Sequence, residues 1–370
     1  MLKTSLNEWH AGHGATMTDF HGWHMPLYYA GITQEHNHTR TRAGLFDLGH
    51  MGRVFVWGDK ARDFVNVLTP AKVATAKPGD VQYSFLLRPD GTVIDDITIY
   101  YGDAEILLVI NAGNRERDVE WIREQADKFG AGVEIEDRGE SWGMIALQGP
   151  LSLEIMGRLF DKQITGLEYY TFAKIRPESY PGEMIISRTG YTGEDGFEIY
   201  LPTENVQPLW EAIIAAGAAP DDVQPIGLGA RDSLRLEAAM PLYGHELDDS
   251  LTPLHAGLGK FVDLDKGDFV GREPLAELKA AGGPDKKLVG FEMTQRGPIP
   301  RQGFPVLDPA GTPIGQVTSG IFSPTLQKTV GLAYISKEHA AIGSSISIEI
   351  RGRALPATII KRPFYRRHAG

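Results

Sequence analysis

Residues 81–101 read VQYSFLLRPDGTVIDDITIYY, which is two runs of strand-forming residues separated by a turn. Val, Ile, Thr, Tyr and Phe favour strands, and Pro89-Asp90-Gly91 between the runs is typical of a tight turn. We therefore predict a β-hairpin here. ILLVINA at 106–112 is expected to add a third strand.

The segments on either side of this hairpin predict a mixed α/β region. RVFVWG at 53–58 has the composition of a short strand. Asp59 is expected to cap a helix that runs through Leu68. A longer helix is expected from Asn114 to Phe129, because apolar residues recur along it at helical spacing.

A second α/β region is expected beyond residue 140. A helix is predicted to start near Pro150, and another spans 204–217. The first fifty residues are rich in His, Trp and Tyr and predict no regular structure. The predicted strands of this region are GMIALQG at 143–149, MIISRTG at 184–190 and FEIYL at 197–201.

The sequence pattern changes at Gly282-Gly283-Pro284-Asp285, and nearly every segment after it predicts a strand. The predicted strands are joined by short segments of typical turn residues, such as DPAG at 308–311. We therefore predict two mixed α/β domains followed by a C-terminal β-barrel, an α+β fold.

Composition narrows the possible functions. The 370 residues are 42% hydrophobic and 23% charged, as expected for an ordinary globular protein of two or three domains. No apolar run approaches the roughly 20 residues of a membrane helix, and the N-terminus has no apolar signal core, so we expect a cytoplasmic protein with no membrane partner. The absence of cysteine excludes disulfides, thiolate metal sites and a cysteine nucleophile.

The distribution of charge argues against nucleic acid as a partner. The formal net charge is −11, whereas phosphate binding draws on clustered Lys and Arg. One basic cluster stands at the end of the chain, and it is either a solvated tail or a contact for an acidic ligand or protein. Its members are Lys361, Arg362, Arg366, Arg367 and His368.

Two adjacent acids, Asp95 and Asp96, lie in the predicted hairpin. Adjacent strand residues point to opposite faces of a sheet, so only one of them can enter a given pocket. The face of Asp95 carries Val93, Ile97 and Ile99, whereas that of Asp96 carries Ile94, Thr98 and Tyr100. The mixed face suits a ligand wall, and Asp96 is therefore our candidate for the chemistry. The alternative is that both acids are solvated beside the turn.

Two glycine-rich stretches also suit a ligand pocket. In GYTGEDGFE at 190–198, the glycines predict a tight bend, Tyr191 can stack on a ring, and Glu198 can accept two N–H donors. In GLGARDSLRLEA at 227–238, Arg231 can hold a carboxylate at the start of a helix. The alternatives are an ordinary hairpin turn and a structural arginine–carboxylate pair.

The histidine-rich pieces do not predict a metal site. HGWH at 21–24 and EHNH at 35–38 both lack the i, i+4 spacing of a helical zinc motif. There is also no GxSxG elbow and no P-loop, so neither a serine nucleophile nor nucleotide hydrolysis is supported.

Nine stretches occur in order along the chain: DFHGWHMPLYY, GLFDLGHMG, TVIDDITIYY, VINAGNRE, ALQGP, RTGYTGEDGFEIY, GLGARDSLRLEA, LYGHELD and GIFSPTL. Together they resemble the aminomethyltransferase family of the glycine cleavage system, the T-proteins. The resemblance runs essentially from end to end, and nine short motifs in the right order are specific.

The resemblance implies a three-domain cloverleaf with tetrahydrofolate in a central channel. It implies domains at 1–52 with 140–250 and at 53–139, a linking segment at 251–285, and a barrel at 286–370. It also implies the reaction: the methylene carbon passes from the aminomethylated lipoyl arm of the H-protein to tetrahydrofolate. The products are 5,10-methylenetetrahydrofolate and ammonia.

Residue roles also follow from the resemblance. The family's catalytic acid matches Asp96, its pterin-reading carboxylate Glu198, its stacking tyrosine Tyr191, and its arginine for the glutamyl end of folate Arg231. No role is carried to Met240, where some members have tyrosine. Further pocket-lining positions match Met51, Tyr83, Tyr100, Asn111 and Tyr169.

Three other functions share this fold family. The first is a tetrahydrofolate-dependent demethylase of another small donor, such as dimethylsulfoniopropionate or an aryl methyl ether. The second is a folate-binding accessory protein of iron–sulfur cluster maintenance, which would carry a cysteine motif that this chain lacks. The third is the folate domain of a sarcosine or dimethylglycine dehydrogenase, which would need a long dinucleotide-binding half.

Overall fold

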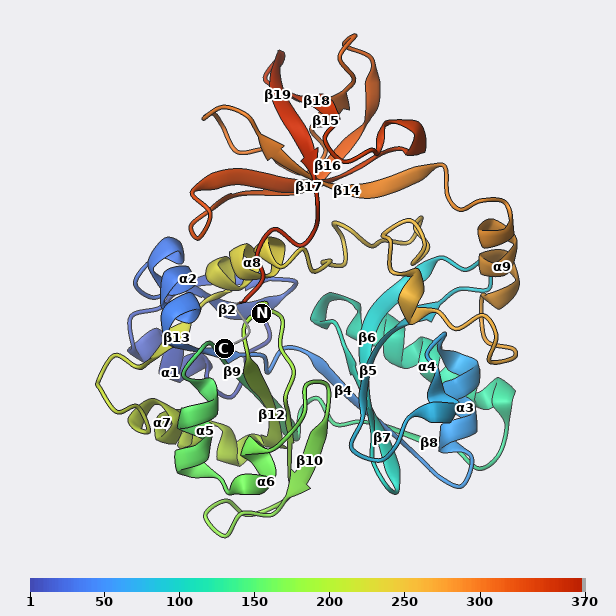
Figure 1. Cartoon of the computed structure of the whole chain (residues 1–370). Helices are drawn as coiled ribbons and strands as arrows, with labels where there is room; N and C mark the ends of the chain where they lie inside the picture. The colour runs from blue at the N-terminus through green and yellow to red at the C-terminus, as the bar shows by residue number, and fades with distance from the viewer. Residues whose placement is uncertain (368–370) are drawn as a thin grey trace.

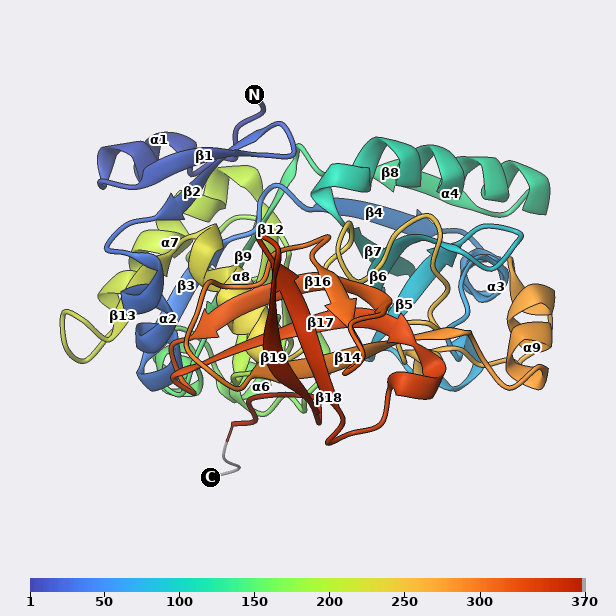
Figure 2. The same cartoon turned by 90° about the horizontal axis from the view of Figure 1, so that it is seen from above.

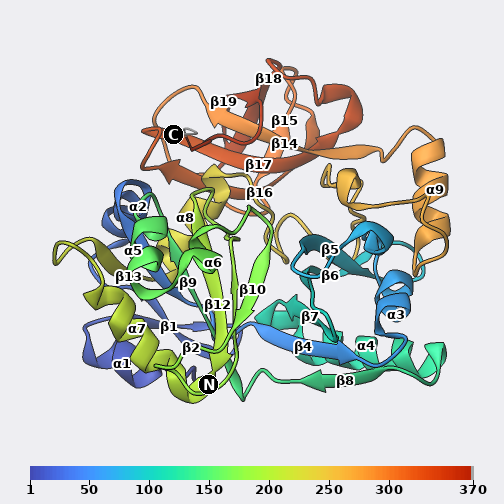
Figure 3. The same cartoon turned by 60° about the horizontal axis from the view of Figure 1, so that its bottom comes forward.

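The computed structural model describes residues 1–367 and has three lobes (Figure 1). Two lobes are sheets with helices packed on them, and the third is a closed barrel that lies across both (Figures 1 and 2). Figure 3 shows the same three lobes from below. Within the described residues, no helix combines the length and apolar character that crossing a membrane requires. His368, the last member of the basic cluster, lies outside the described residues.

The first lobe is built on a six-stranded sheet of order β10-β11-β12-β9-β3-β13. Its neighbours are antiparallel except for β13 and β3, which run parallel. Its buried core packs apolar side chains of the sheet against α5 and α7 around Trp210. The strands are β3 Ala43–Asp47, β9 Trp142–Gln148, β10 Phe172–Ile175, β11 Met184–Ser187, β12 Gly196–Pro202 and β13 Val223–Ile226.

The second lobe is built on a five-stranded antiparallel sheet of order β5-β6-β7-β4-β8. Helices α3 and α4 cover one face of it, with Phe64 and Ile122 buried against the sheet. The strands are β4 Gly52–Trp57, β5 Val81–Leu87, β6 Val93–Tyr101, β7 Glu105–Ile110 and β8 Glu134–Asp137. The predicted hairpin at 81–101 is therefore present as β5 and β6.

The third lobe is a closed antiparallel barrel of order β14-β17-β16-β15-β18-β19, so the predicted C-terminal barrel is confirmed. Alternate side chains fill its interior, among them Phe291, Val317 and Ile348. The strands are β14 Lys286–Met293, β15 Pro305–Leu307, β16 Pro313–Ser323, β17 Lys328–Ser336, β18 Ser345–Ile350 and β19 Arg353–Ile360.

The first fifty residues contain regular structure that the sequence did not predict. A hairpin of β1 and β2 stands beside two helices, and its side chains are mostly polar or aromatic, which hides the period of each short element. The helices of the chain are α1 Asn7–Gly12, α2 Ile32–Thr41, α3 Ala61–Leu68, α4 Arg115–Phe129, α5 Ser152–Leu159, α6 Lys162–Thr165, α7 Val206–Ala215, α8 Leu228–Glu237 and α9 Arg272–Ala280, with β1 Thr16–Phe20 and β2 Trp23–Tyr28.

One predicted helix cap is wrong: α3 begins after Lys60 and has no side-chain cap, so Asp59 does not cap it. The helix predicted from Asn114 to Phe129 is present as α4, which begins directly after Asn114. The Asn114 side-chain amide donates to Asp95 Oδ1 at 2.7 Å. The domain boundaries given above stay predictions.

Candidate functional site

Asp96 lies in the middle of β6, on the face of the sheet that looks away from α3 and α4. From Asp95 to Tyr101 the strand alternates, and Ile97 and Ile99 enter the helix-covered core. Ile94 was predicted to share the face of Asp96, and this is wrong because Ile94 enters the same core. A register shift opposite Leu86 and Leu87 breaks the alternation at that end of the strand.

Both carboxylate oxygens of Asp96 are held. The Tyr83 hydroxyl donates to Oδ2 at 2.9 Å, and the Asn111 side-chain amide donates to Oδ1 at 3.1 Å. Burial, and then the neighbouring Asp95 charge, raise the pKa of Asp96 to about 7. A carboxyl with such a pKa changes its charge in the range where most enzymes work.

Asp95 points the other way and is completely buried. It accepts hydrogen bonds from the Asn111 backbone N–H at 2.8 Å, the Asn111 amide at 2.9 Å and the Asn114 amide at 2.7 Å. Asp95 therefore fixes the start of α4 against the sheet, while Asp96 stays half-buried on the other face.

Glu198 lies on β12, directly after the glycine-rich bend, and only 9% of it is exposed. Thr189 Oγ1 donates to its Oε2 at 2.5 Å and the Tyr100 hydroxyl at 3.2 Å. Burial raises the pKa of Glu198, which these donors oppose. Tyr100 is itself buried, and its hydroxyl oxygen is 2.7 Å from that of Tyr200.

Arg231 lies in the first turn of α8, and its Cζ is 4.7 Å from the ring centroid of Tyr191. Within residues 1–367, no carboxylate lies in ion-pair range of this guanidinium. Burial lowers the pKa of Arg231. Arg235, one turn later, is instead paired with Glu246 and Asp232, both at 2.8 Å. Arg235 therefore forms structural ion pairs, whereas Arg231 has no carboxylate partner among residues 1–367.

Three further predicted residues are Met51, Tyr169 and Tyr83. Met51 is half-buried against the core shared by the two sheets. Tyr169 is 48% exposed and meets Tyr170 edge to face at 4.9 Å between centroids. Tyr83 also lines a cleft of about 380 Å³ together with Tyr170 and Phe261.

Electrostatic effects link several of the predicted residues. Asp96 and Arg231 both act electrostatically on Tyr191, and Glu198 acts on Arg231. These residues offer an anchored carboxyl, a buried acceptor and a cation without a carboxylate partner among residues 1–367. Groups of this kind can bind N–H donors and a carboxylate.

Comparison with known families decides the relationship. A family described as "GCVT N-terminal domain" matches residues 6–266, and one described as "Glycine cleavage T-protein C-terminal barrel domain" matches residues 286–366. The chain belongs to the glycine cleavage T-protein family.

Curated relatives and a solved structure agree with this assignment. The chain is 46% identical over 370 residues to an aminomethyltransferase of Symbiobacterium thermophilum, covering 99% of this chain and 98% of the relative. It is 45% identical over 369 residues to that of Desulfitobacterium hafniense, covering 99% of each. The crystal structure of aminomethyltransferase T from Bartonella henselae superposes with a TM-score of 0.90 at 33% identity, covering 98% of each chain. These matches support the aminomethyltransferase activity and give no support to the demethylase alternative.

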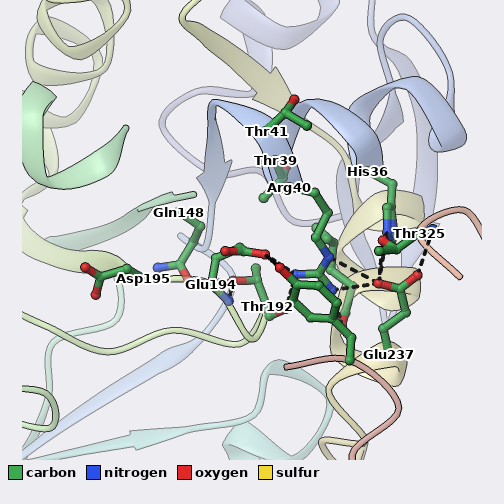
Figure 4. Close-up of polar contacts among 12 residues, drawn as sticks. His36, Thr39, Arg40, Thr41, Gln148, Thr192, Glu194, Asp195, Glu237 and Thr325 are labelled. Carbon is green, nitrogen blue, oxygen red and sulfur yellow. Dashed lines mark hydrogen bonds and ion pairs between the residues drawn. The ribbon is translucent and has the colours of Figure 1, made fainter. Parts of the chain in front are cut away.

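One part of this T-protein site was not found from the sequence. Arg40 of α2 lies between two acids, as Figure 4 shows, and is 2.9 Å from both Glu194 and Glu237. It also donates to the Thr192 carbonyl at 2.8 Å, and its guanidinium stacks 3.9 Å from the Tyr365 ring centroid. Arg40 therefore stabilises the bend at 190–198 through Thr192 and Glu194.

The EHNH segment belongs to the same network. His36 Nε2 is 3.2 Å from Glu237 and 3.0 Å from the Thr325 hydroxyl (Figure 4). His36 Nδ1 is 2.7 Å from the Ser233 hydroxyl. Glu35 accepts the Gly227 backbone N–H at 2.8 Å. This segment joins α2, α8 and the barrel. Its partners lie up to 289 residues away in the sequence, so no local pattern could have revealed them.

Proposed function

We propose that the interior region between Asp96, Glu198 and Arg231 binds tetrahydrofolate as the acceptor of the methylene carbon. The donor in this proposal is the aminomethylated dihydrolipoyl arm of the H-protein. The carbon exchanges its bonds to sulfur and nitrogen for bonds to two folate nitrogens, giving 5,10-methylenetetrahydrofolate, ammonia and the free dithiol arm. Arg231 carries the proposal, because a half-buried guanidinium with no carboxylate partner among residues 1–367 is explained by an anionic ligand.

The other groups fit the same ligand. Glu198 has two oxygens in a buried site and can accept the paired N–H donors of an aminopyrimidinone ring. Tyr191, already stacked beside Arg231, would extend an aromatic wall toward the ligand. The ligand's carboxylate would complete the coordination of Arg231.

Asp96 would act on the reacting nitrogens. Positive charge passes between nitrogens as ammonia leaves, and an ionised carboxylate held beside them stabilises that charge. Tyr83 and Asn111 fix both oxygens of Asp96, so little reorganisation is required during the reaction. Holding two large substrates in register would supply much of the remaining acceleration.

The H-protein as partner and a cytoplasmic location belong to the same proposal. We propose no role for the described part of the basic tail in either, because Arg367 is already engaged with Asp195 at 3.0 Å.

The deciding experiment measures methylenetetrahydrofolate formation with aminomethylated H-protein, beside the same assay with dimethylsulfoniopropionate. We expect turnover with the first donor alone. Turnover with dimethylsulfoniopropionate, or none with aminomethylated H-protein in the presence of tetrahydrofolate, would overturn the proposed substrates.

A further inference from the structure

Asp118 is a buried acid that the mechanism does not use. It lies in the first turn of α4 and has no solvent exposure. Neither of its carboxylate oxygens accepts a hydrogen bond from any described residue. The nearest cation is Arg117, whose Nε is 3.9 Å from Oδ1, beyond hydrogen-bonding distance. An ionised carboxylate without donors would be costly at such a position.

The neighbour of Asp118 explains this arrangement. The Asp118 carboxyl lies within hydrogen-bonding range of the Asp95 carboxyl. Two ionised carboxylates are both acceptors and cannot bond to each other, so one of them must carry a proton. Asp95 already accepts N–H donors at three of its roughly four acceptor sites. The free site is on Oδ2, and the proton therefore belongs on Asp118.

The consequence reaches Asp96 through Asn111. The Asn111 amide donates both to Asp95 Oδ1 at 2.9 Å and to Asp96 Oδ1 at 3.1 Å. An Asp95 carboxylate that is saturated with donors fixes which way this amide faces. The amide then fixes Asp96, whose other oxygen is held by Tyr83.

We propose that Asp118 is a positioning residue: it remains protonated, donates to Asp95 and so locks the Asp95–Asn111–Asp96 chain of hydrogen bonds. This inference rests on the proposed function only for its effect on turnover. The charged and titratable groups that act on Asp118 are Asp95 and Asp96 from β6 and Arg117 from its own helix, and burial raises the pKa of Asp118 well above its usual range.

A first experiment tests the proton without any substrate. Infrared spectra at pH 7 are compared in an Asp96→Asn background, so that Asp96 itself contributes no neutral acid. We expect the carbonyl absorption of buried neutral carboxylic acids to decrease on adding Asp118→Asn and to be kept on adding Asp127→Asn, an exposed change in the same helix. Undiminished absorption after Asp118→Asn, or no such absorption at the start, overturns the proposal.

A second experiment tests the positioning role. Asp118→Asn keeps an N–H donor for Asp95, whereas Asp118→Ala removes it. We expect kcat to fall roughly tenfold further in the alanine variant, about 1.4 kcal/mol at the transition state, with unchanged folate affinity in both. Equal kcat values would overturn the positioning role. Absent turnover in the wild-type protein would instead overturn the proposed function, and the infrared result would stand if the alanine variant did not fold.

Discussion

Asp96 combines two properties: both its carboxylate oxygens accept hydrogen bonds from defined donors, and the residue is only half-buried. We expect Asp96→Asn to lower kcat roughly 10²-fold or more while folate affinity changes little, because the amide keeps the shape and loses the charge. Single-turnover kinetics and a folate titration measure the two quantities. Asp103→Asn, an exposed acid beyond the same strand, is the control. A fully active Asp96→Asn variant would refute the role.

The pH profile tests the same residue without removing it. The carboxyl of Asp96, with its pKa raised to about 7, is neutral below that pH and anionic above it. If the anion stabilises developing positive charge, kcat rises with pH through about 7 and then levels. The inflection should disappear in Asp96→Asn. A rate that falls with rising pH in this range would instead indicate that the protonated acid is the active form.

At the scale of the element, α8 carries two arginines with opposite tasks. We expect Arg231→Ala to raise KM for tetrahydrofolate roughly tenfold to a hundredfold, the effect of losing a charged hydrogen bond, with little change in stability. Arg235→Ala leaves Glu246 buried without its partner and should lower the free energy of unfolding by about 3–5 kcal/mol. Folate kinetics and urea unfolding of both variants separate these effects, and similar behaviour of the two would count against the assignment.

Sequence patterns predicted helices and strands correctly where the residues of an element follow a regular period. The alternation of β6 and the turn before it identified the hairpin, and the strand-rich C-terminal third identified the barrel. The pattern failed where a bulge breaks the alternation, as at Ile94, and at the start of α3, where Asp59 does not cap the helix. Local spacing contains neither kind of information.

The same limit applies to the candidate site. Carboxylates, glycines and an arginine were visible as separate motifs, but the distinction between Arg231 and Arg235 depends on Glu246, which a helical period does not reveal. The roles of Asp118 and Arg40 depend on partners brought together by the fold.

At the scale of the whole molecule, one network joins the lobes. Arg40 and His36 of α2 meet Glu237 of α8, and Thr325 of the barrel donates to that glutamate at 2.9 Å (Figure 4). The tail that follows the barrel returns to this network through Tyr365, whose hydroxyl donates to Glu194 at 2.7 Å. Despite burial, the His36, Ser323 and Arg40 contacts lower the pKa of Glu237 to about 2.

This network should set the acid stability of the protein. A carboxyl whose pKa is lowered on folding contributes stability that is complete above its unfolded pKa of about 4.3 and is lost as pH falls toward its folded value. We expect the unfolding free energy of the wild-type protein to decline between about pH 4.3 and 2, and Glu237→Gln to reduce that decline. Urea unfolding at a series of pH values measures both slopes. An unchanged slope in the variant would exclude Glu237 as a source.

Replacing Arg40, the cation at the centre of this network, should destabilise the bend at 190–198. Arg40→Met leaves Glu194 and Glu237 buried without their cation, and we expect about 3–5 kcal/mol less unfolding free energy. Hydrogen exchange should quicken in the bend at 190–198, because Arg40 also holds the Thr192 carbonyl. Arg123→Met, an exposed change on α4, is the matched control. Combining Arg40→Met with Glu237→Gln should cost less than the sum of the two, by roughly 0.5–3 kcal/mol. Strict additivity would show that the two residues act independently, and unchanged exchange in the bend would show that Arg40 does not stabilise it.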